Sequence, residues 1–241
     1  MKKIGLVGGI SWTSTVDYYR FINEETNRIL GGVNFAECII YSLNFEKFSS
    51  SNAAYDWEGT FKLLLTAVKN LEKAGAEVIM LGANTAHIVA ELIAEKTDLP
   101  IIDIRSVTAE AIRKQNISKV GLLGTSYTME LDFYKNKLLS HGVEAIVPAE
   151  KQDRDYIEET LVQELGKGVV AETTKREYIR IANTLINQGA EAIVLGCTEI
   201  PLLLSQEDFN VPVFNTTQIH AESTVKFALS TEAADKNLIN E

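Results

Sequence analysis

Cys197 is the residue of this sequence with the clearest potential for chemistry. It directly follows residues 189–196, an apolar run with the composition of a buried strand, and helix-like sequence comes after it. A thiol at the N-terminus of a helix has a lowered pKa and can act as a base or a nucleophile. A lone cysteine is also commonly a buried structural residue, so position alone leaves both roles open. Cys38, in a strand-like run, is expected to lie in the core.

Hydroxyl and amide side chains follow three other apolar runs in the same way. Each set stands where a strand is expected to end and a helix to begin, so hydroxyls and free backbone N–H groups could hold an anion such as a carboxylate. Asn and Thr also cap helices well, and capping is compatible with ligand binding. Together with a threonine beside the cysteine, the candidate ligand-binding residues at these strand ends are Ile10, Ser11, Asn84, Thr85, Thr125, Thr128 and Thr198. His87 and His220 fall on predicted helices and are expected to be packing residues.

The composition excludes several classes of protein. The net charge of -10 argues against binding to nucleic acid or to an anionic membrane surface, which require basic patches. It does not argue against a small anionic substrate, because a few local donors can outweigh the global field. No apolar run reaches the roughly 18 residues of a transmembrane helix, and the first residues do not resemble a signal peptide. A cytoplasmic location is expected. The two cysteines and three histidines are scattered, so neither a disulfide framework nor a metal site is expected.

The two halves of the sequence resemble one another, which indicates an internal repeat. Three apolar runs recur in the same order, roughly 115 residues apart, as expected of a duplicated unit. The matching runs are residues 3–8 with 119–124, 75–82 with 189–196, and 99–102 with 211–214. Ala83 and Cys197 therefore occupy equivalent positions in the two halves.

Strand-like runs that alternate with helical patterns predict βαβ units and a parallel sheet. We therefore expect an α/β fold of two similar, doubly wound parallel-sheet lobes related by a pseudo-two-fold axis, residues 1–103 and residues 104–216. The C-terminal segment, residues 217–241, is expected to pack its helix back on the first lobe and to be frayed over its last dozen residues. Ligands of such sheets bind beyond the carboxyl ends of the strands, so the active site is expected in the cleft between the lobes.

Several motifs of the chain occur together in one known family. They are Gly-Gly-Ile-Ser-Trp at residues 8–12, Tyr-Ser-x-Asn-Phe at 41–45, Ala-Asn-Thr-Ala-His at 83–87, Gly-Thr-x-x-Thr at 124–128 and Gly-Cys-Thr-Glu at 196–199. In this combination the sequence resembles the aspartate/glutamate racemase family over nearly its whole length. The resemblance implies a homodimeric, cofactor-independent amino-acid racemase, an isomerase with a small amino acid as its substrate. It also implies that Asn52, expected in a loop, contacts the distal carboxylate of the substrate.

The family's chemistry requires two proton-carrying groups, one on each face of the substrate Cα. The resemblance implies two thiols that remove and deliver the proton, while hydroxyls, Asn and backbone N–H groups hold the carboxylate and ammonium groups. Ala83 stands where the family carries the first cysteine, or in some members a threonine, and its methyl group cannot carry a proton. Three explanations are open: an engineered removal, a natural one-cysteine enzyme in which water or another group serves the second face, or different chemistry.

Racemisation of aspartate or glutamate through Cys197, impaired by Ala83, is the function that the sequence favours. One alternative is a one-cysteine decarboxylase or isomerase of the same superfamily, as in arylmalonate decarboxylase, which resembles this family. Another is a non-catalytic binder of amino acids. A dinucleotide-binding fold is not favoured, because the glycines of residues 5–9 do not fit the G-x-G-x-x-G pattern.

Overall fold

The structure is a computed structural model that describes residues 1–230. The chain divides into two compact units, Met1–Asp103 with the residues from His220 onward, and Ile104–Ile219. The predicted fraying of the last dozen residues falls outside the described part of the chain. No helix within residues 1–230 is both long and apolar enough to cross a membrane.

The first unit contains a four-stranded parallel sheet in the order β2-β1-β3-β4. Its elements are β1 (Ile4–Gly8), α1 (Trp12–Leu30), β2 (Cys38–Ser42), α2 (Phe45–Ala53), α3 (Trp57–Lys73), β3 (Val78–Leu81), the 3-10 helix η1 (Thr85–Val89), α4 (Ala90–Ala94) and β4 (Ile101–Ile102). The last helix within residues 1–230, α10 (Thr216–Leu229), begins in the second unit and continues into the first.

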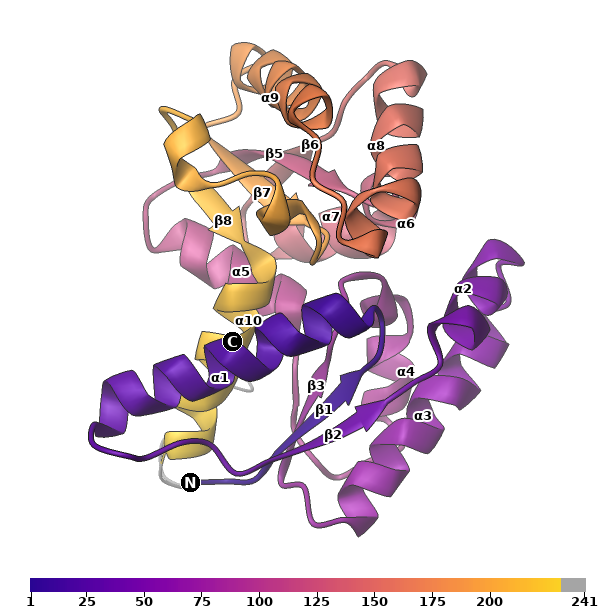
Figure 1. Cartoon of the computed structure of the whole chain (residues 1–241), viewed down its shortest axis with the longest axis vertical. Helices are drawn as coiled ribbons and strands as arrows, with labels where there is room; N and C mark the ends of the chain where they lie inside the picture. Colours follow the sequence, from indigo (N-terminus) through magenta and orange to yellow (C-terminus); the bar gives the residue numbers. More distant parts are fainter. Residues whose placement is uncertain (231–241) are drawn as a thin grey trace. The chain divides into compact units, whose positions relative to one another are not determined.

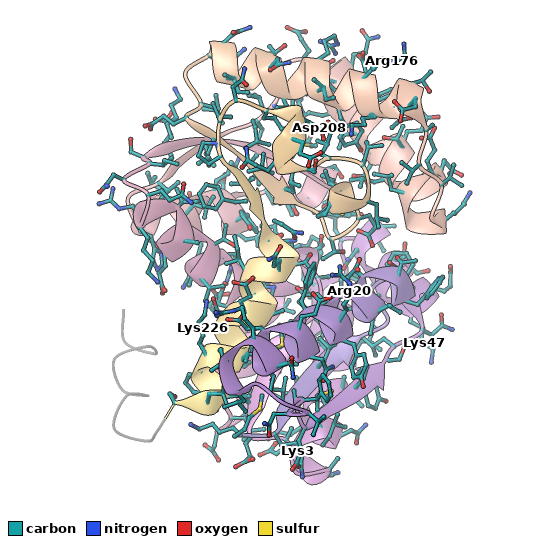
Figure 2. The ribbon with its side chains drawn as sticks, turned by 60° about the vertical axis from the view of Figure 1, so that its left-hand side comes forward. Lys3, Arg20, Lys47, Arg176, Asp208 and Lys226 are labelled. Carbon is teal, nitrogen blue, oxygen red and sulfur yellow. The ribbon has the colours of Figure 1, made fainter. Side chains whose placement is uncertain are left out.

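Helices cover both faces of the first sheet. Ile4 and Leu6 of β1 pack with side chains of α1 and α10, whereas Val7 packs with side chains of α3 on the opposite face; Figure 1 shows α1 and α10 together and α3 apart from them. Lys226 of α10, labelled in Figure 2, lies 3.6 Å from the carboxylate of Glu25 on α1. A parallel sheet buried on both faces explains why its strands are apolar throughout.

The second unit repeats this plan with a sheet in the order β6-β5-β7-β8, again parallel. Its elements are α5 (Ile104–Arg113), β5 (Lys119–Gly124), α6 (Ser126–Glu130), α7 (Asp132–Ser140), β6 (Glu144–Ile146), α8 (Lys151–Gln163), η2 (Leu165–Lys167), α9 (Glu172–Asn187), β7 (Ala192–Gly196), η3 (Ile200–Leu202), η4 (Gln206–Asp208) and β8 (Val213–Asn215). The two apolar clusters of this unit lie on the two faces of its sheet. The prediction of two similar parallel-sheet α/β lobes is therefore confirmed.

Two equivalent glycines show how the repeated sequence produces repeated packing. A β-carbon at Gly5 would lie 2.8 Å from Cβ of Ala76 and 3.3 Å from Cβ of Leu71, and one at Gly121 would lie 3.0 Å from Cβ of Leu185. In each unit the glycine therefore allows a helix, α3 or α9, to approach the first strand of the sheet closely. This steric requirement explains the Gly at the third position of both strand runs.

Helix α3 begins at Trp57 because the side chain of Asp56 caps it, accepting a hydrogen bond from the N–H of Gly59 at 2.8 Å. Three local predictions need correction. Asn52, expected in a loop, lies in α2 and is buried. The helices expected directly after β3 and β7 are short 3-10 turns, η1 and η3. Cys197 therefore does not stand at the N-terminus of an α-helix. Cys38, expected in the core, is only partly buried.

Candidate active site

In the second unit, Thr125 and Cys197 follow the ends of two neighbouring strands. The last pair of the β5–β7 ladder joins Gly124 to Gly196, so the residues after them leave the sheet side by side. This is the carboxyl edge of a parallel sheet, the usual place for ligands in α/β proteins. The structure thus brings two of the predicted segments to one sheet edge.

The thiol of Cys197 is bonded to a carboxylate. Its S–H donates to Oε2 of Glu199 at 3.0 Å, and the hydroxyl of Thr198 donates to the same oxygen at 2.9 Å. All three residues are buried, and Cys197 is 9% exposed. The segment turns tightly here, because the N–H of Ile200 donates to the carbonyl of Cys197 at 3.2 Å. A thiol and a carboxylate thus share one buried position at the end of β7.

This environment raises the pKa of Cys197 well above its ordinary value. Burial is the main cause, followed by the negative charge of Glu199 and by its hydrogen bond to the thiol; the backbone N–H of Glu199 acts in the opposite direction. The lowered pKa expected for this thiol is therefore wrong, because no α-helix begins at Cys197 and a carboxylate lies beside it. The resting side chain is a protonated thiol at neutral pH, which suits it to donate a proton.

Two further ionisable groups influence Cys197 from the helices of the same unit. Glu158 of α8 raises the pKa of the thiol through its charge, and Tyr178 of α9 is in turn affected by the charge of Cys197. Burial raises the pKa of Tyr178, whose hydroxyl donates to the carbonyl of Ile157 at 3.2 Å. The surroundings of the sulfur are therefore neutral or negative, which favours the thiol over the thiolate.

Thr125 and Thr128 form the cap of α6. Oγ1 of Thr125 accepts from the N–H of Thr128 at 3.3 Å, and the two hydroxyl oxygens lie 3.2 Å apart. The backbone N–H of Ser126, the residue after Thr125, donates to Oε2 of Glu158 at 2.7 Å. A carboxylate of the protein thus already occupies one of the donors that the sequence offered to a substrate.

In the first unit, the segment after β1 is held by hydroxyl groups. The N–H of Gly9 donates to Oγ1 of Thr15 at 2.8 Å, and that hydroxyl donates to the carbonyl of Ser11 at 2.8 Å. The Ser11 hydroxyl lies 2.7 Å from that of Thr13. Ile10 and Ser11 are both buried. These bonds fix the path of the chain from β1 into α1.

The segment after β3 contains Ala83, Asn84 and Thr85, and all three residues are buried. The carbonyl of Ala83 is bonded to Nδ1 of His87 at 3.0 Å. The ring of His87 packs edge-on against that of His220, with centroids 5.7 Å apart. Both histidines are fully buried, as expected for packing residues. His87 is also hydrogen-bonded to the backbone of Ala83, just after the end of β3.

Asn52 contacts a neighbouring helix. Its Oδ1 accepts a hydrogen bond from Oγ1 of Thr60 at 2.9 Å, in a buried position. This bond ties α2 to α3 within the first unit. If Asn52 binds a ligand, its amide Nδ2 is the group that would do so, since Oδ1 already has a donor.

The predicted site residues are divided between the two units. The first contains Ile10, Ser11, Asn52, Ala83, Asn84 and Thr85, and the second contains Thr125, Thr128, Cys197 and Thr198. The predicted cleft between the lobes stays a prediction. Sequence reasoning missed Glu199, although it stands two residues after Cys197, and Glu158, for which the sequence has no signal. No group of three or more His, Cys, Asp or Glu side chains among residues 1–230 is arranged to hold a metal ion.

Comparisons with known proteins bear on the family and the fold of the chain. The profile of the family described as Asp/Glu/Hydantoin racemase matches residues 7–224. The crystal structure of a candidate Asp/Glu racemase from Yersinia pestis is 43% identical, with a TM-score of 0.88, over 95% of this chain and 100% of that one. An aspartate racemase homologue from Pyrococcus horikoshii OT3 is 36% identical, with a TM-score of 0.84 and the same coverage. A broad-specificity amino-acid racemase of Bacillus subtilis is 24% identical over 94% of this chain and 98% of its own.

Proposed function

The chain belongs to the Asp/Glu/hydantoin racemase family, and from this premise we propose that it racemises an acidic amino acid, aspartate or glutamate, without a cofactor. The observation that carries the proposal is the buried thiol of Cys197, which stands at the carboxyl edge of its sheet and is bonded to the carboxylate of Glu199. A thiol in this position can exchange a proton with the Cα of a bound amino acid.

The reaction consists of proton removal and return at Cα. When the sulfur acts as a base, the Cα–H bond breaks, an S–H bond forms, and the electron pair of carbon moves into the substrate carboxylate. When it acts as an acid, the thiol returns a proton to the planar carbanion. Each transfer needs the sulfur within about 3 Å of the reacting atom in a productive pose. The raised pKa of Cys197 favours the thiol, so we propose the acid role as that of the resting enzyme.

We propose that the substrate carboxylates and ammonium group are held by the polar residues of the strand ends. These are Ser11, Asn84, Thr85, Thr125, Thr128 and Thr198 with the backbone at Ile10, and Nδ2 of Asn52 would hold the distal carboxylate. Preorganised donors of this kind stabilise the charge that develops as the α-proton leaves.

We propose that Ala83 makes the activity one-sided. It occupies the position equivalent to Cys197 in the repeat, and its methyl group can neither accept nor donate a proton. Exchange of the α-hydrogen on the face served by Cys197 then proceeds, while inversion is slow.

A one-cysteine decarboxylase or isomerase is the second candidate function. The observation that favours it is that Cys197 is a protonated thiol while Ala83, at the equivalent position of the repeat, cannot carry a proton, because delivery of one proton to one face of an enolate needs only a single acid. Release of carbon dioxide from a malonate-type substrate would distinguish this activity from racemisation.

We propose that the functional form is a homodimer, as the family resemblance implies, and that it is cytoplasmic, as expected from the sequence. Sedimentation velocity at several protein concentrations tests the dimer, and a monomer at all concentrations contradicts it.

The proposed function is tested with L- and D-aspartate and L- and D-glutamate in D2O. Proton NMR follows loss of the α-hydrogen, and chiral chromatography follows configuration. We expect exchange of one enantiomer of one substrate, slow inversion, and loss of both in the variant Cys197→Ala. Cys38→Ala is the matched control, because it removes the other thiol of the chain and is expected to leave exchange intact. Absence of exchange for all four substrates, in the protein and in Ala83→Cys, refutes racemisation.

A further inference from the structure

The carboxylate of Glu199 is placed to receive the proton of Cys197. Oε2 of Glu199 lies 3.0 Å from the sulfur, and the thiol hydrogen already points to it as a donor. We propose that Glu199 is the proton-holding partner of Cys197: its carboxylate takes the thiol proton when the sulfur acts as a base and returns it afterwards. This inference rests on the proposed function, to which it adds a second ionisable residue.

Placing two negative charges together in a buried site is costly. Cys197 and Glu199 are both more than nine-tenths buried, and the charge of Glu158 of α8 further disfavours the thiolate. A thiolate formed by loss of its proton to solvent would add a second negative charge beside Glu199, and a nearby like charge strongly disfavours ionisation. Transfer of the proton to Glu199 avoids this, because the pair keeps a total charge of minus one until the sulfur takes the α-hydrogen, after which the negative charge lies on the substrate.

The step balances within the pair. The S–H bond breaks and leaves its electron pair on sulfur, while an O–H bond forms on Oε2 of Glu199. The thiolate then takes the α-hydrogen of the substrate, and the reverse sequence returns both protons. The hydroxyl of Thr198 donates to Oε2 at 2.9 Å. Since a hydroxyl is both a donor and an acceptor, it can instead accept from the carboxylic acid that forms.

Glu199 can act on Cys197 in two ways, by only repelling the thiolate or by holding the proton of the thiol. The two roles predict opposite changes in the rate of α-hydrogen exchange. In either case, Glu199→Gln removes a negative charge and increases the thiolate at a given pH. If Glu199 only repels, exchange of the substrate α-hydrogen becomes faster in the variant. If Glu199 holds the proton, exchange becomes slower although more thiolate is present. Opposite changes in thiolate and exchange are therefore the signature of the proposed role.

The test measures both quantities on the full chain. Iodoacetamide labelling of Cys197 from about pH 6 to pH 10, followed by peptide mass spectrometry, gives the relative thiolate fraction and therefore any shift of the ionisation midpoint between variants. We expect Glu199→Gln to lower this midpoint by about one unit, which is about a tenfold faster labelling below both midpoints. We expect exchange of the α-hydrogen in D2O to fall by about tenfold or more, the lower range for loss of an acid–base group.

Two variants and an internal reference complete the design. Glu159→Gln removes a charge from an exposed position of α8 and is expected to change neither quantity. Glu199→Asp keeps an ionisable carboxyl group and is expected to exchange faster than Glu199→Gln. Labelling of Cys38 reports on the integrity of the first unit in every variant, and its rate is expected to be constant.

The outcomes separate this inference from the proposed function. If the protein exchanges the α-hydrogen and Glu199→Gln exchanges it equally fast or faster, the proton-holding role is refuted while the proposed function stands. If the labelling midpoint does not move in Glu199→Gln, the pair is refuted whatever the activity. If the unmodified protein exchanges no substrate, the proposed function fails, and the labelling midpoints alone then decide whether Cys197 and Glu199 form a coupled pair.

Discussion

Replacing His220 by glutamine is expected to make the stability of the first unit less sensitive to acid. The imidazole is fully buried; its Nε2 donates to the carbonyl of Ile102 at 2.8 Å, and its Nδ1 accepts from the hydroxyl of Tyr18 at 3.0 Å. This pattern uses both ring nitrogens of the neutral form. Burial, reinforced by the charge of His87, lowers the pKa of His220 from 6.5 to about 3. Folding therefore keeps this side chain uncharged over the whole range from neutral pH to about pH 3.

The sign and size of the effect follow from linkage. Because the pKa is lower in the folded state, His220 contributes stability that is fully present above pH 6.5 and is lost as the pH falls towards 3. The difference of about 3.5 units corresponds to about 5 kcal/mol in total, at 1.36 kcal/mol per unit. Between pH 7 and pH 5 His220 takes up a proton only in the unfolded chain, and the free energy of unfolding falls by about 2 kcal/mol in this interval. This interval lies above the range in which most carboxylates titrate.

Urea unfolding at pH 7, 6 and 5 measures this loss. Both tryptophans of the chain, Trp12 and Trp57, belong to the first unit, so their fluorescence follows the unit that contains His220. His220→Gln is expected to be less stable at pH 7, and its further loss down to pH 5 is expected to be smaller than that of the unmodified protein by about 2 kcal/mol. His141→Gln, in the second unit, is the control and is expected to behave as the unmodified protein. Equal losses in His220→Gln and the unmodified protein refute the argument that the buried imidazole is held neutral.

Three further substitutions test the site and the packing. Ala83→Cys is expected to increase the rate of inversion relative to the rate of α-hydrogen exchange by about 10²–10⁴-fold, the usual contribution of an acid–base group. Chiral chromatography measures the inversion. An unchanged ratio of the two rates means that the second face of the substrate Cα is not served from this position. Gly121→Ala is expected to lower the free energy of unfolding, measured in urea, by about 1–3 kcal/mol, because its methyl group would lie 2.9 Å from Cδ1 of Ile193. Unchanged stability would contradict the close approach of α9. Thr60→Val is expected to lower the free energy of unfolding by about 1–3 kcal/mol in the same assay, because the buried Oδ1 of Asn52 loses its hydrogen-bond donor. An unchanged free energy of unfolding would show that water replaces that donor.

The fold was predictable because its signals are local and repeated. Gly5 and Gly121 stand at the same place in two apolar strand runs, and in both units a helix packs against the glycine. The runs are apolar throughout because helices bury both faces of each sheet. The candidate site residues were chosen because polar side chains follow the apolar strand runs in the sequence, and their role in a site stays a prediction.

The chemistry of the site was less predictable because it depends on contacts and on the lengths of helices. The prediction of a lowered pKa for Cys197 assumed an α-helix after β7, and the segment instead forms the 3-10 turn η3. Glu158 acts on the sulfur only because α8 packs over the end of β5, a contact between residues far apart in the sequence. Asn52 was expected in a loop because Ser and Asn are poor helix formers, but its side chain bonds Thr60 of α3 and stabilises α2.

The repeat also indicates how the two strand ends would divide the work in a restored enzyme. Thr85 stands at the position equivalent to Glu199, so a thiol introduced by Ala83→Cys would lack the carboxylate at the equivalent position that raises the pKa of Cys197. A two-thiol racemase needs one thiolate and one thiol at the start of each turnover, since one group must accept a proton and the other must donate one. Both positions are buried, and Glu199 adds to burial in favouring the thiol at Cys197. The introduced sulfur would therefore be the thiolate. In Ala83→Cys we expect iodoacetamide to label the introduced thiol with a lower pH midpoint than Cys197, and the reverse order would show that Glu199 does not determine which sulfur carries the proton.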